Sequence, residues 1–233
     1  MHDLCCLLRR NVYPGRGIML GNSRNLETSI ALYFIMGRSV NSRNRIFLRD
    51  GNSVRIEVFD SALVKDPSLI LYHPMLEINE QLIVTNGDQT VTIFDALQVG
   101  NSYESALRTR AFEPDAPHFT PRVSGILDIK NGDYRLSLLK AGDPLGTSCQ
   151  RFFFEYGAQA GRGHFIHTYQ GNGDPLPSFS GEPLCVDIPD DLEAFAQDVW
   201  ASLNAENRVA LFLRRQERDG RLAGISICNR HDA

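Results

Sequence analysis

The chain has 233 residues, a formal net charge of -4 at pH 7 and a hydrophobic share of 42%. This length and composition are typical of one large or two small globular units with a real core. The mild acidity argues against nucleic acid as a partner, because nucleic-acid binding usually needs a basic face. No apolar run approaches the roughly 18 residues of a membrane span, so we also expect no membrane partner and a cytoplasmic location.

The first ten residues predict a short amphipathic helix that packs on the body of the protein. Their apolar part is short, and Arg9 and Arg10 follow it rather than precede it, which is unlike a signal peptide. Five cysteines are scattered along the chain without a C-x-x-C pair. We therefore predict free thiols that are buried or half-buried, no disulfide framework and no metal site.

Apolar and alternating runs predict strands in the first half of the chain, at residues 17–21, 29–36, 53–59, 69–72 and 81–85. Asp88 is placed to cap a helix that reaches residue 97 and ends at Gly100. Ser102 is placed to cap a second helix, 103–108. Three prolines make residues 112–121 a loop.

Strands resume at 123–129 and 134–139, and the Asn131-Gly132 pair between them predicts a hairpin. The remaining predicted elements are strands at 151–156 and 164–169, a long loop at 171–183, a helix capped by Asp191, and a hairpin of 208–215 with 221–228. Segregated strands and helices favour an α+β fold over an alternating α/β fold. We predict a single domain over residues 1–233, with the C-terminal helix and hairpin, from about residue 190, packed on it.

An arginine cluster follows the apolar run 30–35. Arg38, Arg43 and Arg45 lie within eight residues and alternate with Asn, Ser and Gly. Close guanidinium groups repel one another unless an anion lies among them, and arginine matches phosphate and carboxylate with two parallel hydrogen bonds. The cluster therefore predicts a site for a phosphorylated small molecule. A solvated charged turn is the alternative.

Two further segments are candidates for chemistry. Residues 85–90 lie where a strand gives way to a helix, whose free N–H groups attract anions; a plain capped turn is the alternative. Residues 110–122 carry Glu113 and Asp115 on a loop stiffened by prolines, which suits an acid/base group; charges that pair only with each other are the alternative. Tyr72, on sequence alone, reads as a core residue.

His164 and His167 lie three apart on a predicted strand and therefore point to opposite faces, which is poor geometry for one metal. We expect one to be exposed and the other structural. The sequence contains no G-x-S-x-G, P-loop or H-E-x-x-H signature.

Several of these segments resemble the archaeal-type IMP cyclohydrolase family in its bacterial branch. The matching segments are Tyr13–Gly17, Gly37–Arg45, Thr85–Thr90, Phe112–Pro117 with Thr120–Arg122, and Gly163–Tyr169. The likeness runs from about residue 13 to about residue 183. It implies a four-layer αββα sandwich similar to the N-terminal nucleophile hydrolases. It also implies closure of 5-formamidoimidazole-4-carboxamide ribotide to inosine monophosphate, without cofactor or metal.

The resemblance also implies roles for individual residues. Glu113, Tyr72 and Arg38 match catalytic positions: a proton shuttle, a donor to the formyl oxygen and a stabiliser of negative charge. Residues expected to bind the ribotide are Asn44, Arg45, Asn86, Gly87, Asp88, Thr120 and Arg122. The expected partners are this small-molecule substrate and further copies of the chain in a homo-oligomer. The alternatives are a purine-nucleotide-binding protein without turnover, and an amidohydrolase of the same fold, for which no self-processing site at Cys5 or Cys6 is evident.

Overall fold

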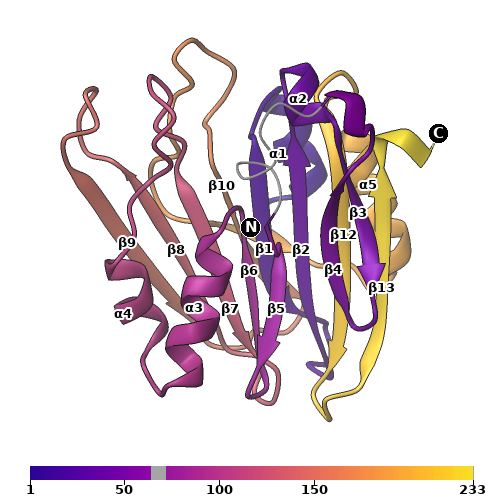
Figure 1. Ribbon diagram of the computed structural model, residues 1–233. Coiled ribbons are helices and arrows are strands. Elements are labelled where there is room, and N and C mark those ends of the chain that lie inside the picture. The colour runs from indigo at the N-terminus through magenta and orange to yellow at the C-terminus, as the bar shows by residue number, and fades with distance from the viewer. Residues whose placement is uncertain (64–71, 233) are drawn as a thin grey trace.

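The computed structural model describes residues 1–63 and 72–232, and these form an α+β protein. One antiparallel sheet has six strands in the order β11-β10-β1-β2-β12-β13, and a second has five in the order β5-β6-β7-β8-β9. The strands β3 and β4 form a separate hairpin that contacts β12 and β13. Figure 1 shows the two sheets with helices on their outer sides.

The bounds of the elements follow the chain. The helices are α1 (Leu4–Arg10), α2 (Val40–Arg43), α3 (Gln89–Gln98), α4 (Tyr103–Arg108) and α5 (Leu192–Ser202), with short 3-10 turns at η1 (Ser61–Leu63) and η3 (Arg230–Asp232). The strands of the six-stranded sheet are β1 (Arg16–Asn22), β2 (Thr28–Met36), β10 (Arg162–His167), β11 (Leu184–Asp187), β12 (Arg208–Glu217) and β13 (Leu222–Asn229). The other strands are β3 (Arg45–Asp50), β4 (Ser53–Val58), β5 (Met75–Ile78), β6 (Gln81–Thr85), β7 (Arg122–Asp128), β8 (Tyr134–Ala141) and β9 (Cys149–Tyr156).

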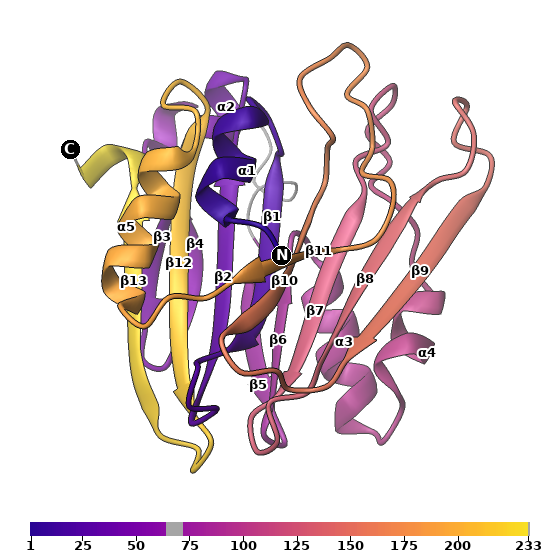
Figure 2. The ribbon, with the colours of Figure 1, turned by 180° about the vertical axis from the view of Figure 1, so that it is seen from behind.

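Strand β2 explains how the layers are held together. Its side chains alternate, so that Tyr33 joins the core between the two sheets and Phe34 joins a second core against α1 and α5. A strand covered on both faces is apolar almost throughout, as the run 30–36 is. On the far side, Tyr103 and Ile126 belong to a third core, between the five-stranded sheet and the helices α3 and α4. Figures 1 and 2 show the two helix pairs on opposite outer faces.

Most predicted elements are confirmed, and their caps explain several boundaries. Ser102 and Asp191 accept hydrogen bonds from the backbone N–H of Ser105 and Ala194, as N-caps do. Asp88 occupies the cap position of α3 but makes no side-chain cap bond. The C-terminal hairpin is an integral part of the six-stranded sheet, because β12 lies between β2 and β13.

Some predictions were incomplete or wrong. Strand β11 lies just beyond the predicted loop 171–183, α2 lies within the arginine cluster, and neither was predicted. Residues 69–71 of a predicted strand lie outside the described residues. All five cysteines are free, as expected, but Cys6 is exposed. Within the described residues, no helix has the length and apolar character needed to cross a membrane.

His164 and His167 point to opposite faces of β10, as predicted, but both are buried, so the expectation that one is exposed was wrong. The Nδ1 atom of His164 lies 2.7 Å from the Tyr134 hydroxyl, and that of His167 lies 2.9 Å from the Tyr169 carbonyl oxygen. Burial lowers the pKa of each imidazole to about 4. The fold therefore holds both rings neutral.

Acid should destabilise the protein through these rings. A depressed folded-state pKa gives stability that is present above the ordinary histidine value and is lost as the pH falls from about 6.5 towards about 4. For His167 the loss reaches at most about 3 kcal/mol. Urea unfolding of His167→Asn, which keeps a donor near Nδ1, should show a smaller fall in unfolding free energy over this range. The exposed His73→Asn is the control, and equal pH slopes in wild type and His167→Asn would contradict the prediction.

Candidate functional site

A cavity of about 610 Å³ opens where β1, β7 and the turn before α3 come together. This volume is within the range of small-molecule sites, roughly 300–1,000 Å³. Its lining is charged and polar, and comes from five separate stretches of chain. The lining residues are Arg16, Tyr72, Asn86, Gly87, Asp88, Arg110, Glu113, Pro114, Asp115 and Arg122.

Glu113 places a carboxyl group among cationic side chains in this cavity. Burial raises the pKa of Glu113 above its ordinary value, and the nearby Arg16 and Arg122 oppose this effect without cancelling it. Glu113 in turn helps to keep Arg16 charged: burial opposes the charge, the Glu113 carboxylate favours it, and the pKa of Arg16 is raised. A carboxyl whose pKa is raised can exchange a proton nearer to neutral pH.

Asp88 ties two arginines to the start of α3. It forms ion pairs with Arg110 and, at 2.6 Å, with Arg122. Burial alone would raise the pKa of Asp88, but the hydrogen bond from Arg110 and the charge of Arg122 lower it below its ordinary range. Arg122 also donates to Gln89 at 2.7 Å, and its buried Nε has no partner among the described residues. The carboxylate of Asp88 therefore positions arginines and leaves donors for a ligand.

Gly87 allows the backbone to approach this network closely. A Cβ atom built at Gly87 would lie 2.7 Å from Nη1 of Arg122, 2.7 Å from Oε1 of Gln89 and 3.5 Å from Oε1 of Glu113. Any larger residue would therefore push the Arg122 guanidinium out of its place.

We expect Gly87→Ala to weaken ligand binding at this cavity at least tenfold, because the added methyl group displaces Arg122. The protein should remain folded, since the displaced side chains, Arg122 and Gln89, are polar and lie outside the three apolar cores. Calorimetric titration with inosine monophosphate, the product that the sequence resemblance implies, measures the effect. Gly171→Ala is the matched control, because a Cβ there meets its nearest neighbour only at 4.0 Å. Unchanged affinity in Gly87→Ala would contradict this reading.

Tyr72 forms part of the cavity wall, and Tyr33 supports it from the core behind. The hydroxyl of Tyr72 lies 2.6 Å from that of Tyr33, which is fully buried in the core between the sheets. Burial raises the pKa of both phenols, so both stay protonated at neutral pH. The guanidinium of Arg45 is near both tyrosines, and its buried Nη1 has no partner among the described residues. Tyr72 is thus a protonated phenol held in place from behind, and it can donate to a ligand when Tyr33 is the donor between the two hydroxyls.

The loop that carries Glu113 is fixed by polar contacts at its base. Asp115 accepts a hydrogen bond from the backbone N–H of Thr120 at 2.7 Å and another from the Thr120 hydroxyl. The Thr120 hydroxyl also meets the hydroxyl of Tyr169. Tyr169 stacks on Tyr13 with ring centroids 5.9 Å apart. These contacts hold Glu113 and Asp115 in the cavity wall.

The structure brings together six of the residues that the sequence predicted for the site. The cavity lining includes Tyr72, Asn86, Gly87, Asp88, Glu113 and Arg122. The side chain of Asn86 is occupied by the protein: it donates to the Pro121 carbonyl oxygen and accepts from Gln89 and Val123. The Asn86 side chain therefore builds the floor of the cavity.

Four predicted site residues do not line this cavity. Arg38 is exposed, donates to Asn172 and Gly173, and lies over the ring of Tyr13 at 5.3 Å. Asn44 forms two hydrogen bonds of 2.7 Å with the backbone of Asp60. Arg45 is buried near Tyr33 and Tyr72. Thr120 lies at the base of the Glu113 loop, where it contacts Asp115 and Tyr169. Three arginines cluster in the sequence, but α2 separates their side chains.

The sequence analysis did not choose Arg16, Arg110 or Asp115 as site residues, although each lies in a segment that it singled out. Arg16 lies within Tyr13–Gly17, one of the segments that match the family. The signal that could have identified it is a charged residue at the head of a strand, β1, that is otherwise buried. Arg110 gave no such signal, because its role depends on where the chain places Asp88.

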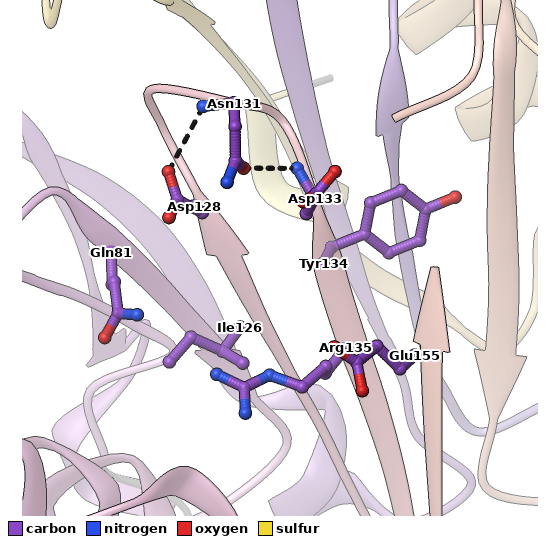
Figure 3. Close-up of a pocket in the computed structure, with 8 residues that line it drawn as sticks. All are labelled: Gln81, Ile126, Asp128, Asn131, Asp133, Tyr134, Arg135 and Glu155. Atoms are coloured by element: carbon purple, nitrogen blue, oxygen red, sulfur yellow. Dashed lines mark hydrogen bonds between the residues drawn. The ribbon is translucent and has the colours of Figure 1, made fainter. Parts of the chain in front are cut away.

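A second cavity, of about 250 Å³, lies at the β7–β8 hairpin and contains none of the predicted site residues. Figure 3 shows the acidic side chains there. Asp128 accepts from the backbone N–H of Asn131, and Asn131 accepts from that of Asp133, so these residues stabilise the turn itself. Among the described residues, no group of three His, Cys, Asp or Glu side chains is arranged to hold a metal.

Two comparisons with known proteins both match this chain to IMP cyclohydrolases. A family model described as "IMP cyclohydrolase-like protein" matches residues 13–220. This match extends beyond residue 183, where the resemblance found in the sequence ended. An IMP cyclohydrolase of Methanopyrus kandleri is 33% identical over 120 residues, which cover 50% of this chain and 59% of the relative. The matched segment thus spans about three fifths of that relative's length. The family match covers most of the chain, and the chain therefore belongs to the IMP cyclohydrolase-like protein family.

Proposed function

We propose that this protein is a cytoplasmic IMP cyclohydrolase that closes the ring of 5-formamidoimidazole-4-carboxamide ribotide to give inosine monophosphate and water. Family membership and the name of the relative from Methanopyrus kandleri support the activity. The observation that carries the proposal is Glu113, a carboxyl with a raised pKa that lines the same cavity as Arg16, Arg122 and Tyr72.

The reaction sets clear requirements on such a site. The carboxamide nitrogen attacks the formyl carbon, forms the new N–C bond and loses one proton, while the formyl oxygen gains one. The resulting hydroxyl group then leaves with a second proton as water, and the formamido nitrogen loses its proton as the C=N bond forms. Because both reacting groups belong to one molecule, holding them in the reactive geometry supplies much of the rate.

Glu113 would carry the protons in this scheme. In its ionised form it accepts a proton from the attacking nitrogen, and in its protonated form it delivers one to the leaving hydroxyl. A raised pKa suits both roles, because the protonated form of Glu113 then persists to higher pH than that of an ordinary glutamate.

Tyr72 and the arginines would stabilise the developing charge. Since burial raises the pKa of Tyr72, its hydroxyl stays protonated and can donate to the formyl oxygen as that oxygen becomes negative. We assign the electrostatic role mainly to Arg16, which lines the cavity. Arg38, which the resemblance places at a catalytic position, would act from outside the cavity lining, where it lies over the ring of Tyr13.

The remaining predicted residues would hold the ribotide. Arg122, positioned by Asp88 and Gln89, offers a donor to the phosphate, and Gly87 gives the ligand access to the backbone. Asn86 and Thr120 would hold the walls, and Asn44 would fix the backbone that precedes β3. Arg45 would add positive potential behind Tyr72.

The fold supports the same assignment. Two facing sheets between two helical layers match the αββα sandwich that the resemblance implies, and we propose that the chain shares the architecture of the N-terminal nucleophile hydrolases. We further propose that turnover needs no metal or cofactor, because the groups above account for every proton moved.

A steady-state assay of the purified protein with the formylated ribotide tests the proposal. Ring closure creates the purine chromophore, so the reaction can be followed by absorbance, and inosine monophosphate can be identified by mass. Turnover that Glu113→Gln abolishes would support the assignment. A thermal shift with inosine monophosphate but no turnover would instead identify a nucleotide-binding protein, and release of ammonia from amide substrates would identify an amidohydrolase.

A further inference from the structure

Strand β9 forms a free edge of the five-stranded sheet. It pairs with β8 on one side, and no strand among the described residues pairs with its other side. Figures 1 and 2 show β9 at the outer margin of the molecule. The strand is eight residues long and contains neither proline nor glycine. Such an edge presents a row of unpaired N–H and C=O groups that can pair with another strand.

The side chains of β9 divide between the two faces of the sheet. Arg151, Phe153 and Glu155 lie on the face towards α4, where Phe153 meets the ring of Tyr103 with centroids 6.3 Å apart. Phe152 and Phe154 lie on the opposite face and stack on each other with centroids 6.5 Å apart. Phe152 is 39% exposed, which is unusual for a phenylalanine in a strand that faces a core.

This pattern is symmetric about Phe153. If a second copy of the strand runs antiparallel with Phe153 opposite its own counterpart, Arg151 lies opposite Glu155 of the second copy, and the reverse pair forms by symmetry. Phe152 then lies opposite Phe154 of the second copy. Directly opposed residues in an antiparallel pair share a face, and opposite charges or aromatic rings in such positions stabilise the pairing.

The two charges are available for this contact. Glu155 forms no ion pair within the part of the chain that the structure describes, because Arg135, its neighbour in the β8–β9 register, donates instead to Glu104 at 2.8 Å. Figure 3 shows Glu155 and Arg135 on these adjacent strands. Arg151 donates only to backbone carbonyl oxygens, chiefly that of Arg110 at 2.7 Å, so no described carboxylate balances its charge.

We propose that two copies of this chain associate through β9, antiparallel and with the two-fold axis at Phe153, so that the five-stranded sheet continues from one copy into the next. A two-fold contact of this kind uses the same surface on both copies and closes after two, which removes both free edges. The proposal rests on the edge strand alone and is independent of the proposed activity.

Other edges fit a second copy less well. Strand β13 carries no charged side chain between Leu222 and Asn229, so nothing there selects a register. Strand β11 has four residues, and His2 already bridges to it at Val186. Of the edge strands β9, β11 and β13, only β9 combines length, exposed aromatic surface and self-complementary charge.

Charge reversal tests the proposed register. Sedimentation velocity over a range of concentrations should show a monomer–dimer equilibrium for the wild type. Arg151→Glu places two glutamates opposite each other at both symmetric positions, and Glu155→Arg places two arginines there. Each single variant should raise the dimer dissociation constant roughly tenfold to a hundredfold. Arg49→Glu, on the exposed β3–β4 hairpin, is the control and should leave association unchanged.

Two rescues separate this interface from simple misfolding. The double variant with Arg151→Glu and Glu155→Arg restores both opposite-charge pairs and should dimerise again. An equimolar mixture of the two single variants should form a heterodimer, because each then supplies the charge that the other needs. A wild type that is monomeric at every concentration would overturn the proposal. So would dimerisation that survives both single variants, or a failure of both rescues.

Discussion

Glu113→Gln is expected to lower kcat by roughly 10²–10⁴-fold, the usual range for removing a general acid/base, while inosine monophosphate still binds within about tenfold, or about 1.4 kcal/mol, of the wild-type affinity. The amide fills the same space but cannot exchange a proton. In the wild type, the rate should fall on the acid side as Glu113 becomes protonated, at a pH above the ordinary glutamate value of 4.5. Steady-state kinetics on the formylated ribotide and calorimetry with the product measure the two quantities.

Stability provides the control for this variant. A raised folded-state pKa gives stability that is present below the ordinary glutamate value and is lost as the pH rises through the raised value. At neutral pH the ionised carboxyl therefore destabilises the fold relative to a neutral side chain. Glu113→Gln should be at least as stable as the wild type at pH 7 in urea unfolding. Normal turnover in a well-folded Glu113→Gln would remove this residue from the mechanism.

Arg16→Ala should cost more activity than Arg38→Ala. Arg16 lines the cavity with Glu113, whereas Arg38 is exposed, does not line the cavity and lies over the ring of Tyr13. Losing a donor to developing negative charge typically lowers kcat/KM by 10²–10³-fold, about 2.7–4 kcal/mol, and we expect this range for Arg16→Ala. For Arg38→Ala we expect a loss below about tenfold, about 1.4 kcal/mol.

The pH profile gives a second readout for Arg16. Its charge is the largest of the effects that lower the pKa of Glu113 against burial. Removing it should raise that pKa further and move the acid limb of the rate profile to higher pH. Arg38→Ala should leave the acid limb in place. Equal losses in both variants, or an unmoved limb in Arg16→Ala, would contradict the electrostatic role assigned to Arg16.

The sequence was informative about elements whose signals are local. The caps Ser102 and Asp191 and the hairpin at Asn131-Gly132 depend on a few neighbouring residues, and all appear as predicted. The Arg16–Glu113 pair depends on the fold, because β1 and the loop after α4 are far apart in sequence. Helix α2, which separates Arg38 from Arg45, was also not predicted from the sequence, since the spacing of charged residues alone does not reveal which way each side chain points.

Asp88 lies at the predicted helix start but has a different chemical role from the predicted one. Its position predicted a cap, and it does stand where α3 begins, but its carboxylate pairs with Arg110 and Arg122 and makes no cap bond. The capping preference of aspartate correctly located the start of α3, but the ion pairs that Asp88 forms depend on tertiary contacts. The same holds for Asn86, whose amide binds protein backbone at the floor of the site.

The position of β12 has a consequence for biosynthesis. Met36 at the end of β2 pairs with Arg208, and the whole apolar length of β2 finds its second neighbour only in β12. The ribosome makes β2 long before that neighbour exists, so one margin of the growing sheet stays uncovered during most of translation. Nascent chains stalled before residue 208 should therefore bind chaperones, whereas the completed chain, once released from the ribosome, should not.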